Sequence, residues 1–434
     1  MKIGIIGLGY VGLPLYVGLP LCVQFAKSGA DVLGIDLDPK KIEALNEGCS
    51  YIKHIPNVAI QNQLNAGRLE ATTDCTRVQE LEAVLICVPT PLDENREPDL
   101  SFVLNTGRSI APHLPKGITV VLESTTYPGT TEDELKPILE QGSGLKAGKD
   151  FYLAYSPERE DPGNPDSQVA KIPKVIGGHT AVCLEKAKAV YQMAIESLVP
   201  VSSCRAAEAT KLLENIHRSI NIALVNELKL VYAEMGIDIW EVIEAAKTKP
   251  FGFTPYYPGP GLGGHCIPID PFYLSWKAKQ HGMATRFIEL SGQINHAMPE
   301  YVVSRCAEAL AARGKKLNDC RILLLGLAYK ADVDDCRESP TFTVMELLRD
   351  AGAEVAYYDP HVPEITPTRE HAEWTGLQSV PWEKSAVEAH DLAVILTAHR
   401  AVDHAQLTEW VPAVVDTRNA LAGIENPKAA IWKA

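Results

Sequence analysis

Residues 2–12 read KIGIIGLGYVG, a short apolar strand that runs directly into a glycine turn. A second apolar run, residues 30–35, ends in Asp36. A strand, a GxGxxG turn, a helix and an acidic residue at the tip of the next strand are typical of a dinucleotide-binding βαβ unit. The glycines admit the pyrophosphate, and the helix N-terminus supplies amide donors. Asp36 would accept hydrogen bonds from the adenosine ribose, so the pattern predicts NAD rather than NADP as the cofactor.

A tandem repeat interrupts this unit, because residues 10–15, YVGLPL, recur at once as residues 16–21. Only the first copy completes GxGxxG. Asp36 follows Gly12 by 24 residues, where about 20 are expected. Six extra residues rotate a continuous helix by about 600°, which turns its apolar face away from the sheet, and Pro20 would interrupt the helix. We therefore expect one copy to loop out and the helix to restart after it.

Three further apolar runs, residues 83–88, 118–122 and 151–154, alternate with helical patterns. This alternation predicts a doubly wound parallel sheet. Ligands bind at the carboxyl ends of such strands. The loops that follow these runs are therefore where cofactor and substrate should meet.

The composition changes after residue 205. Residues 206–236 contain no glycine or proline before Gly236 and predict one long helix. A glycine- and proline-rich loop, residues 257–270, follows, and residues 320–359 repeat a strand–helix–strand pattern without the three-glycine fingerprint. The predicted fold is α/β, with two Rossmann-like doubly wound parallel-sheet domains joined by a central long-helix domain. The expected boundaries are 1–203, 204–315 and 316–434.

The composition is that of a globular protein. The chain has 434 residues, 46% of them hydrophobic and 22% charged, and a net charge of −14. An acidic surface argues against a nucleic-acid partner. Ten cysteines without CxxC spacing predict no metal site and a reducing, cytoplasmic location. The uncharged stretch 3–26 contains five glycines and two prolines, so we expect no membrane anchor there.

Six later segments add to the glycine fingerprint: STTYPG (124–129), SPE (156–158), Lys211 with Asn215, GGHCIPID (263–270), YK (329–330) and DCRESP (335–340). Together these motifs resemble the UDP-glucose/GDP-mannose dehydrogenase family of nucleotide-sugar 6-dehydrogenases over essentially the whole chain. The resemblance rests on the glycine fingerprint and on later segments. UDP-glucose dehydrogenases typically have a lysine at the position of Ile269. The loop 256–274 looks most like UDP-N-acetylglucosamine 6-dehydrogenases, with the UDP-N-acetylmannosamine and UDP-glucose enzymes as alternatives.

The resemblance implies oxidation of the sugar's C6 alcohol to a carboxylate by two NAD⁺ and one water, for surface-polysaccharide precursors. Cys266 would be the nucleophile that holds the aldehyde as a thiohemiacetal and then as a thioester. Gly263 and Gly264 would leave room for close approach to it. The remaining catalytic residues implied are Lys211 and Asn215 as an oxyanion clamp, Asp270 and Thr125 for water activation and proton transfer, and Glu158 as the general acid or base, helped by a pKa raised through partial burial.

The resemblance also assigns residues to the two ligands, with the second α/β unit binding UDP. The residues expected to bind the cofactor are Gly7, Gly9, Tyr10, Val11, Gly12, Asp36, Pro89, Thr90, Ser124 and Thr125. Those expected to bind the UDP-sugar are Glu158, Arg159, Lys211, Asn215, Tyr256, Tyr257, Gly261, Gly263, Lys330 and Arg337.

Simpler interpretations stay open from the residues alone. A cysteine is usually a small buried hydrophobe, and Lys211 with Asn215 could lie on a solvated helix face. Ser156-Pro157-Glu158 could be only a turn with a capping carboxylate, and Lys330 and Arg337 could form surface ion pairs. Two other functions also remain: a two-electron 3-hydroxyacid-type dehydrogenase, and a non-catalytic nucleotide-sugar binder disabled by the repeat.

Apolar positions on the long helix bear on assembly. Ile220, Leu224 and Leu228 would need a partner if they are exposed, which predicts a homodimer or higher homo-oligomer. They could equally pack within one chain.

Overall fold

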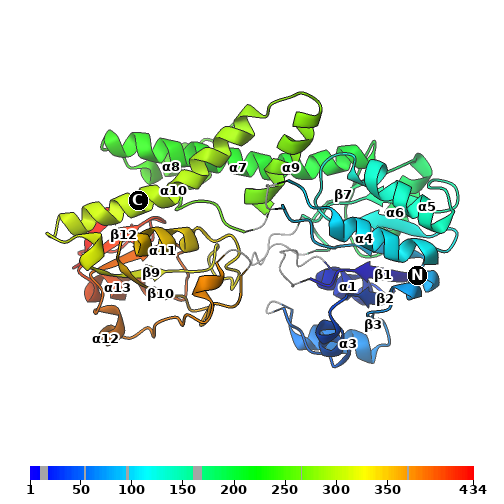
Figure 1. Ribbon diagram of the computed structural model, residues 1–434, viewed down its shortest axis with the longest axis horizontal. Coiled ribbons are helices and arrows are strands. Elements are labelled where there is room, and N and C mark those ends of the chain that lie inside the picture. The colour runs from blue at the N-terminus through cyan, green and yellow to red at the C-terminus, as the bar shows by residue number, and fades with distance from the viewer. Residues whose placement is uncertain (10–17, 53–54, 94–96, 160–168, 265, 369–370) are drawn as a thin grey trace. The chain divides into compact units, whose positions relative to one another are not determined.

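The computed structural model describes residues 1–9, 18–52, 55–93, 97–159, 169–264, 266–368 and 371–434 (Figure 1). It divides into two compact units. Unit 1 comprises Met1–Asn215 with Phe272–Ala284, and unit 2 comprises Ile216–Pro271 with Thr285–Ala434. Two long helices, α7 (Cys204–Glu234) and α9 (Cys266–Gln280), contribute residues to both. The three-segment division at 203 and 315 stays a prediction from the sequence.

Unit 1 is built on an eight-stranded sheet of order β3-β2-β1-β4-β5-β6-β7-β8. The pairs from β3 to β6 are parallel, as predicted. Strand β7 pairs antiparallel to β6 and parallel to β8, so the last two strands run opposite to the rest. The strands are β1 (Lys2–Ile6), β2 (Asp31–Ile35), β3 (Leu69–Thr72), β4 (Ala83–Ile86), β5 (Thr119–Leu122), β6 (Tyr152–Tyr155), β7 (Lys174–Gly178) and β8 (Leu198–Val201).

Helices cover both faces of this sheet, because side chains alternate along each strand. Ile3 and Ile5 pack in one apolar cluster with Leu19 and Phe25 of α1. Ile6 packs on the opposite face, in a cluster that includes residues of α4 and α5. The helices are α1 (Gly18–Lys27), α2 (Pro39–Asn46), α3 (Asn57–Asn65), α4 (Ser101–Ile110), α5 (Lys136–Ser143) and α6 (Ala181–Tyr191), with short helical turns at Cys75–Glu80, Ala111–His113 and Thr130–Leu135.

Helix α1 begins at Gly18, inside the second copy of the repeat. Residues 10–17 lie outside the described part of the chain, so the looped-out copy and the restart of the helix stay predictions from the sequence. Pro20 is the third residue of α1 and so falls in the first turn, where its missing N–H leaves no intrahelical hydrogen bond unmade. The helix ends before Gly29, whose φ of 96° only glycine adopts readily.

Unit 2 contains a parallel sheet of order β10-β9-β11-β12-β13. The predicted second strand–helix–strand unit is confirmed as β9, α11 and β10. The elements are β9 (Arg321–Leu325), β10 (Glu354–Tyr358), β11 (Leu392–Ile395), β12 (Ala413–Asp416), β13 (Ala430–Lys433), α8 (Ile239–Ala246), α10 (Arg286–Ala311), α11 (Pro340–Asp350), α12 (Lys384–Val387) and α13 (His404–Trp410), with short turns at Leu317–Asp319 and Ala372–Trp374.

None of the helices among the described residues combines the length and apolar character that a membrane crossing requires.

The long helix α7 is fastened to the turn after β5 by one buried carboxylate. Glu208 accepts hydrogen bonds from the Gly129 amide at 2.6 Å and the Thr131 amide at 2.9 Å. It also accepts one from the Thr131 hydroxyl at 2.7 Å. These contacts fix the first turns of α7 on unit 1.

Replacing Glu208 should therefore destabilise unit 1. Glu208→Ala leaves two buried amides without an acceptor, so the free energy of unfolding should fall by about 3 kcal/mol. Glu43→Ala, on an exposed position of α2, is the control and should change it by less than about 0.5 kcal/mol. Chemical denaturation followed by circular dichroism measures both, and equal effects would contradict the anchoring role.

Candidate active site

The turn after β1 has the backbone of a dinucleotide turn. Gly7 and Gly9 have φ of 89° and 79°, in the left-handed region that favours glycine. The Gly7 amide donates to the Ile35 carbonyl at 2.8 Å. A Cβ on Gly7 would lie 2.6 Å from the Cys87 carbonyl oxygen, so no side chain fits there. The predicted cofactor residues Tyr10, Val11 and Gly12 lie outside the described residues.

Asp36 is positioned as the acidic residue of this turn. Its carboxylate accepts hydrogen bonds from the Leu8 amide at 2.8 Å, the Asp38 amide at 3.0 Å and the Lys41 ammonium at 3.1 Å. A carboxylate offers about four acceptor sites, so one remains for a ribose hydroxyl. The left-handed glycines and the spare capacity of Asp36 fit NAD.

The loops after β4 and β5 come together, as predicted. The Thr90 hydroxyl donates to the Thr125 carbonyl at 2.7 Å, and the Ser124 hydroxyl donates to the Val88 carbonyl at 2.5 Å. Tyr273 of α9 donates to the Thr90 carbonyl, and Pro89 directly precedes this contact. The buried hydroxyl oxygen of Thr125 has no hydrogen-bond partner among the described residues. A buried hydroxyl in this state suits a ligand contact.

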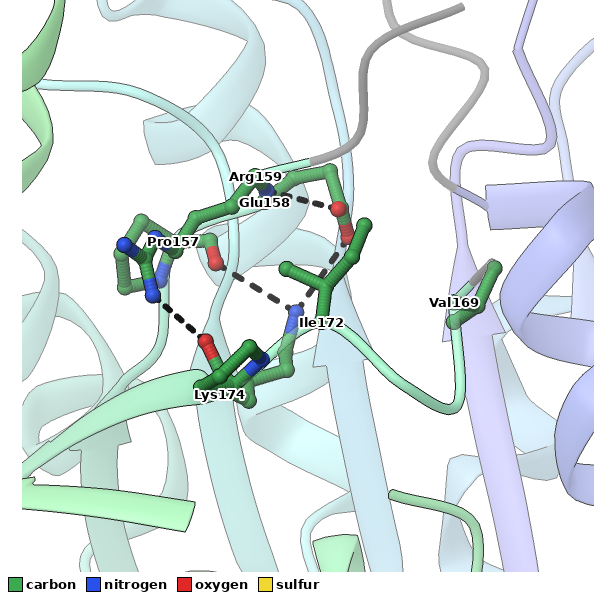
Figure 2. Close-up of a pocket in the computed structure, with 7 residues that line it drawn as sticks. Pro157, Glu158, Arg159, Val169, Ile172 and Lys174 are labelled. Carbon is green, nitrogen blue, oxygen red and sulfur yellow. Dashed lines mark hydrogen bonds and ion pairs between the residues drawn. The ribbon is translucent and has the colours of Figure 1, made fainter. Parts of the chain in front are cut away.

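Glu158 lies in a buried ion cluster at the same edge of the sheet. Lys174 is the first residue of β7, and because β7 runs antiparallel to β6 it starts where β5 and β6 end. Its ammonium lies 2.6 Å from Glu123, directly after β5, and 3.3 Å from Glu158, after β6. Tyr191 donates to Glu123 from α6. Figure 2 shows the Lys174 ammonium directed at Glu158 and at the Pro157 carbonyl.

These contacts stabilise the charge of Glu158. Its second oxygen accepts the Arg159 amide at 2.6 Å, and the side chain is almost fully buried. Burial raises the pKa of Glu123, which the Lys174 ammonium opposes. Ser156 also donates to the Val175 carbonyl at 2.8 Å, so the Ser156-Pro157-Glu158 segment is tied to β7. Neither Lys174 nor Glu123 was identified as a site residue from the sequence. The two side chains meet only because β7 runs antiparallel to β6, which no local pattern shows.

Arg159 joins this loop to α7. Its guanidinium pairs with Glu214 at 2.7 Å and donates to the Pro173 carbonyl at 2.5 Å. Glu214 directly precedes Asn215. Arg159 therefore links the loop of Glu158 to the turn of α7 that carries the predicted clamp.

Lys211 and Asn215 lie one turn apart on α7. Both are buried, with exposed fractions of 5% and 0%. The alternative of a solvated helix face is therefore wrong. The Lys211 ammonium forms no ion pair with any carboxylate in the part of the chain that the structure describes. A buried unpaired ammonium is costly unless a ligand provides negative charge.

Helix α9 begins at Cys266. The Cys266 side chain and His265 lie outside the described residues. Asp270 is buried one helical turn later. Gly263 and Gly264 were expected to leave space beside the nucleophile, but the structure gives another reason for glycine at both positions. A Cβ on Gly263 would lie 2.5 Å from Tyr329 Cβ, and a Cβ on Gly264 would lie 2.9 Å from the Tyr329 ring.

The other predicted substrate residues of unit 2 differ in how far their side chains are already engaged by contacts within the chain. Tyr256 hydrogen-bonds His217 at 2.9 Å, and Tyr257 donates to Glu244 at 2.8 Å. Gly261 has a φ of 137° in the same loop. Lys330 is half-buried after β9. Arg337 forms a two-bond ion pair with Asp335, at 2.7 and 2.5 Å, as the simpler interpretation allowed.

Two cations in unit 2 were not predicted. Lys229 of α7 donates to the Gly259 carbonyl at 3.4 Å, and burial, with the nearby Arg418 charge, lowers its pKa to about 7. Arg418 donates to the Leu396 carbonyl at 2.7 Å, and burial lowers its pKa to about 10. Neither forms an ion pair with a carboxylate among the described residues. Arg418 follows β12 by two residues. Because ligands bind at the carboxyl ends of parallel strands, this position could have identified Arg418 as a candidate binding residue from the sequence.

Asp332, His361 and His399 are close enough to suggest a metal site. His399, however, accepts the Asp332 amide on Nδ1 at 3.0 Å and lies 3.0 Å from Asp359 through Nε2. Nε2 must then carry the hydrogen, and His399 has no lone pair left for a cation. These residues form a hydrogen-bond network around Asp359.

Family models match the chain in three successive segments. The NAD binding domain of the UDP-glucose/GDP-mannose dehydrogenase family matches residues 1–195, its central domain 205–297 and its UDP binding domain 323–423. The chain belongs to the UDP-glucose/GDP-mannose dehydrogenase family. As a member, it is an NAD-dependent UDP-sugar dehydrogenase, and NAD is its cofactor.

Individual relatives of this family cover most of the chain. It is 37% identical to the UDP-N-acetyl-D-glucosamine 6-dehydrogenase of Pseudomonas aeruginosa, over 83% of each. It is 35% identical to the UDP-N-acetyl-D-mannosamine dehydrogenase of Escherichia coli K12, over 93% of this chain and 94% of that one. The solved UDP-D-ManNAc dehydrogenase of Pyrococcus horikoshii superposes with a TM-score of 0.88 at 32% identity, over 100% and 99% of the two chains.

Removing the shared cation should destabilise the sheet edge. Lys174→Met leaves Glu123 and Glu158 buried without a counter-charge, so the free energy of unfolding should fall by about 3–5 kcal/mol. Adding Glu123→Gln should restore part of it. Lys186→Met, an exposed lysine of α6, is the control. Denaturant unfolding distinguishes them, and a Lys174 effect no larger than the Lys186 effect would rule out the ion cluster as a stabilising element.

Lys229 should make the stability of unit 2 depend on pH. In the folded protein it loses its proton near pH 7, whereas in the unfolded chain it stays protonated to about pH 10.5. The unfolded state then binds about one more proton between these values, so stability should rise with pH across this window. Lys229→Met should remove that slope and the exposed Lys316→Met should keep it, as measured by denaturation at pH 7, 8 and 9. An unchanged slope in Lys229→Met would show that Lys229 is charged in the folded protein.

Proposed function

We propose that this enzyme oxidises C6 of a UDP-N-acetylhexosamine, with UDP-N-acetylglucosamine as the preferred substrate, to the uronic acid. The observation that carries the proposal is Lys211, a buried ammonium without a carboxylate partner among the described residues, one turn from the buried amide of Asn215. The relatives named for UDP-N-acetylglucosamine and UDP-N-acetylmannosamine support the class of sugar.

The overall reaction converts one alcohol, one water and two NAD⁺ into one carboxylate, two NADH and three protons. NAD, when bound, supplies the acceptor for each hydride. Cys266 is proposed to add its thiolate to the C6 aldehyde, giving a thiohemiacetal, and to hold the acyl group as a thioester after the second oxidation. Thiolates are stabilised at helix N-termini, and Cys266 is the first residue of α9.

Lys211 and Asn215 are proposed to stabilise negative charge on the C6 oxygen. A buried ammonium interacts more strongly with a developing oxyanion than an exposed one, because little water screens the pair. The free-energy cost of burying the Lys211 ammonium is offset when negative charge forms on the C6 oxygen. Lys211 therefore stabilises mainly the transition states in which that charge develops.

Glu158 is proposed as the general base for thioester hydrolysis. Lys174 and the Arg159 amide stabilise the negative charge of its carboxylate, which is the form that can accept a proton from water. Thr125 would orient that water through its buried hydroxyl, whose oxygen finds no other partner among the described residues. Asp270 is proposed to assist the same proton transfers.

The diphosphate of the substrate is proposed to bind to cations of unit 2. Lys330 is the cation that sequence resemblance suggests. We add Lys229 and Arg418, which both lie beside the Gly259 backbone and have no carboxylate partner among the described residues. Arg418 carries a positive charge, and Lys229 gains one when it binds a proton near pH 7. An anion there would raise the proton affinity of Lys229. Arg337 is less available, since Asp335 occupies its guanidinium.

A comparison of sugars tests the substrate. Initial rates of NADH formation with UDP-N-acetylglucosamine, UDP-N-acetylmannosamine and UDP-glucose should be highest in kcat/KM for the first. Cys266→Ser should reduce turnover by at least about 10³-fold while UDP binding, measured by calorimetry, stays within about twofold.

Three results would redirect the proposal. A preference for UDP-N-acetylmannosamine or UDP-glucose would change the named sugar. Full turnover in Cys266→Ser would favour a two-electron 3-hydroxyacid-type enzyme. No turnover with any sugar, together with intact UDP-sugar binding and no thermal shift with NAD⁺, would favour a non-catalytic binder.

We also propose that the enzyme is a homodimer in the cytoplasm that supplies a precursor for surface polysaccharide. Leu213, Leu224 and Val231 of α7 are exposed by 67%, 49% and 48%. Their spacing of 11 and 7 residues places them in one stripe, with Ile220 between them. An exposed apolar stripe of this kind needs a partner surface.

A charge in the stripe should separate the subunits. Leu224→Glu should convert a dimer into a monomer in light scattering, because a buried carboxylate without a partner is unfavourable at an interface. Val182→Glu, at an exposed apolar position of α6, should leave the mass unchanged. A wild-type protein that is monomeric at micromolar concentration would refute the dimer.

A further inference from the structure

The first residue of α1 lies against the glycine turn with no room for a side chain. A Cβ on Gly18 would overlap the carbonyl oxygen of Gly7, and it would lie 2.9 Å from the Gly7 carbonyl carbon and 3.1 Å from Leu8 Cα. All three atoms are backbone atoms. A larger residue at position 18 would therefore require α1 to move away from β1.

This contact is the one that the third glycine of a dinucleotide fingerprint makes. That glycine permits close packing of the helix on the strand, and the first two shape the turn. By sequence pattern the third glycine is Gly12. In the structure the close helix–strand approach is made by Gly18.

The spacing to Asp36 and the packing of the following residues both favour Gly18 as the third glycine of the fingerprint. Asp36 follows Gly18 by 18 residues and Gly12 by 24, and the usual separation is about 20. Leu19 and Leu21, which follow Gly18, are fully buried in the core of unit 1. The second copy of the repeat therefore provides both the glycine contact and the apolar face of the helix.

We propose that the functional fingerprint of the NAD turn is Gly7, Gly9 and Gly18, and that one YVGLPL unit is inserted between the second and third glycines. By this assignment Gly18, and not Gly12, is the third glycine of the fingerprint, and the GxGxxG match at residues 7–12 is coincidental. The proposal refines the NAD site, and it does not depend on which sugar is oxidised.

Deleting one copy of the repeat cannot test this, because removal of either copy leaves the same sequence. Matched substitutions can. Gly18→Ala should raise the Kd for NAD⁺, measured by calorimetry, by at least about tenfold and should lower the Tm, since the added methyl group overlaps Gly7. Gly12→Ala should change the Kd by less than about twofold and the Tm by less than about 1 °C.

A second pair covers the case in which Gly18→Ala does not fold. Leu21→Ala removes a buried side chain and should lower the Tm by about 5 °C or more, whereas Leu15→Ala, the same residue of the first copy, should lower it by less than about 2 °C. Greater loss in Gly12→Ala and Leu15→Ala than in their counterparts would overturn the proposal, as would equal tolerance of all four. Neither readout uses turnover, so an enzyme inactive toward every sugar would refute the proposed function and leave this assignment standing.

Discussion

The carboxyl edge of the unit 1 sheet depends on one buried ammonium. Lys174 lies between Glu123 and Glu158, with all three side chains nearly inaccessible to water. Burial penalises the charged form of both carboxylates by several kcal/mol for an unpaired ion, and the Lys174 ammonium opposes that penalty. The reversal of β7 places Lys174 at that edge, where β5 and β6 end. The antiparallel pair is therefore the structural reason that the buried Glu158 faces an ammonium beside the predicted catalytic loops.

The two sheets carry similar turns with different capacities for a ligand. Gly7 and Gly326 each follow the first strand of their unit with a φ of 89°. Asp36 retains acceptor capacity after three hydrogen bonds, as NAD binding requires. Asp359 accepts the amides of Leu327, Ala328, His361 and Val362 and contacts His399. That carboxylate has no site left for a ribose hydroxyl, which agrees with the absence of the glycine fingerprint in the second sheet and with its match to the UDP binding domain.

Local sequence patterns predicted the elements that depend on local physics. The apolar runs at β1, β2, β4, β5 and β6 and the long helix α7 were found from their periodicity. Strands β3, β7 and β8 were missed because each is short and two include charged residues, as in LEAT and KVIGG. The antiparallel pairing of β7 is a property of the whole sheet, which no local pattern encodes.

The residues of the candidate site also fall into those that local sequence predicted and those that depend on the folded chain. Motif resemblance located Glu158, Lys211 and Asn215, and the structure adds that all three are buried. Lys174, Lys229 and Arg418 carry no motif, since each gains its environment from segments distant in the chain. Only Gly12 completes the GxGxxG spacing in the sequence, whereas the packing of Gly18 against Gly7 is the basis for proposing Gly18 as the third glycine.

The central claim is that one site removes four electrons from one carbon without releasing the aldehyde. The most direct measurement is the end-point ratio of NADH formed to UDP-N-acetylglucosamine consumed by the wild-type enzyme, with an aldehyde-trapping amine present. The account predicts a ratio of two, carboxylate as the only product and no trapped aldehyde. A ratio of one, with trapped aldehyde in equal amount, would contradict it.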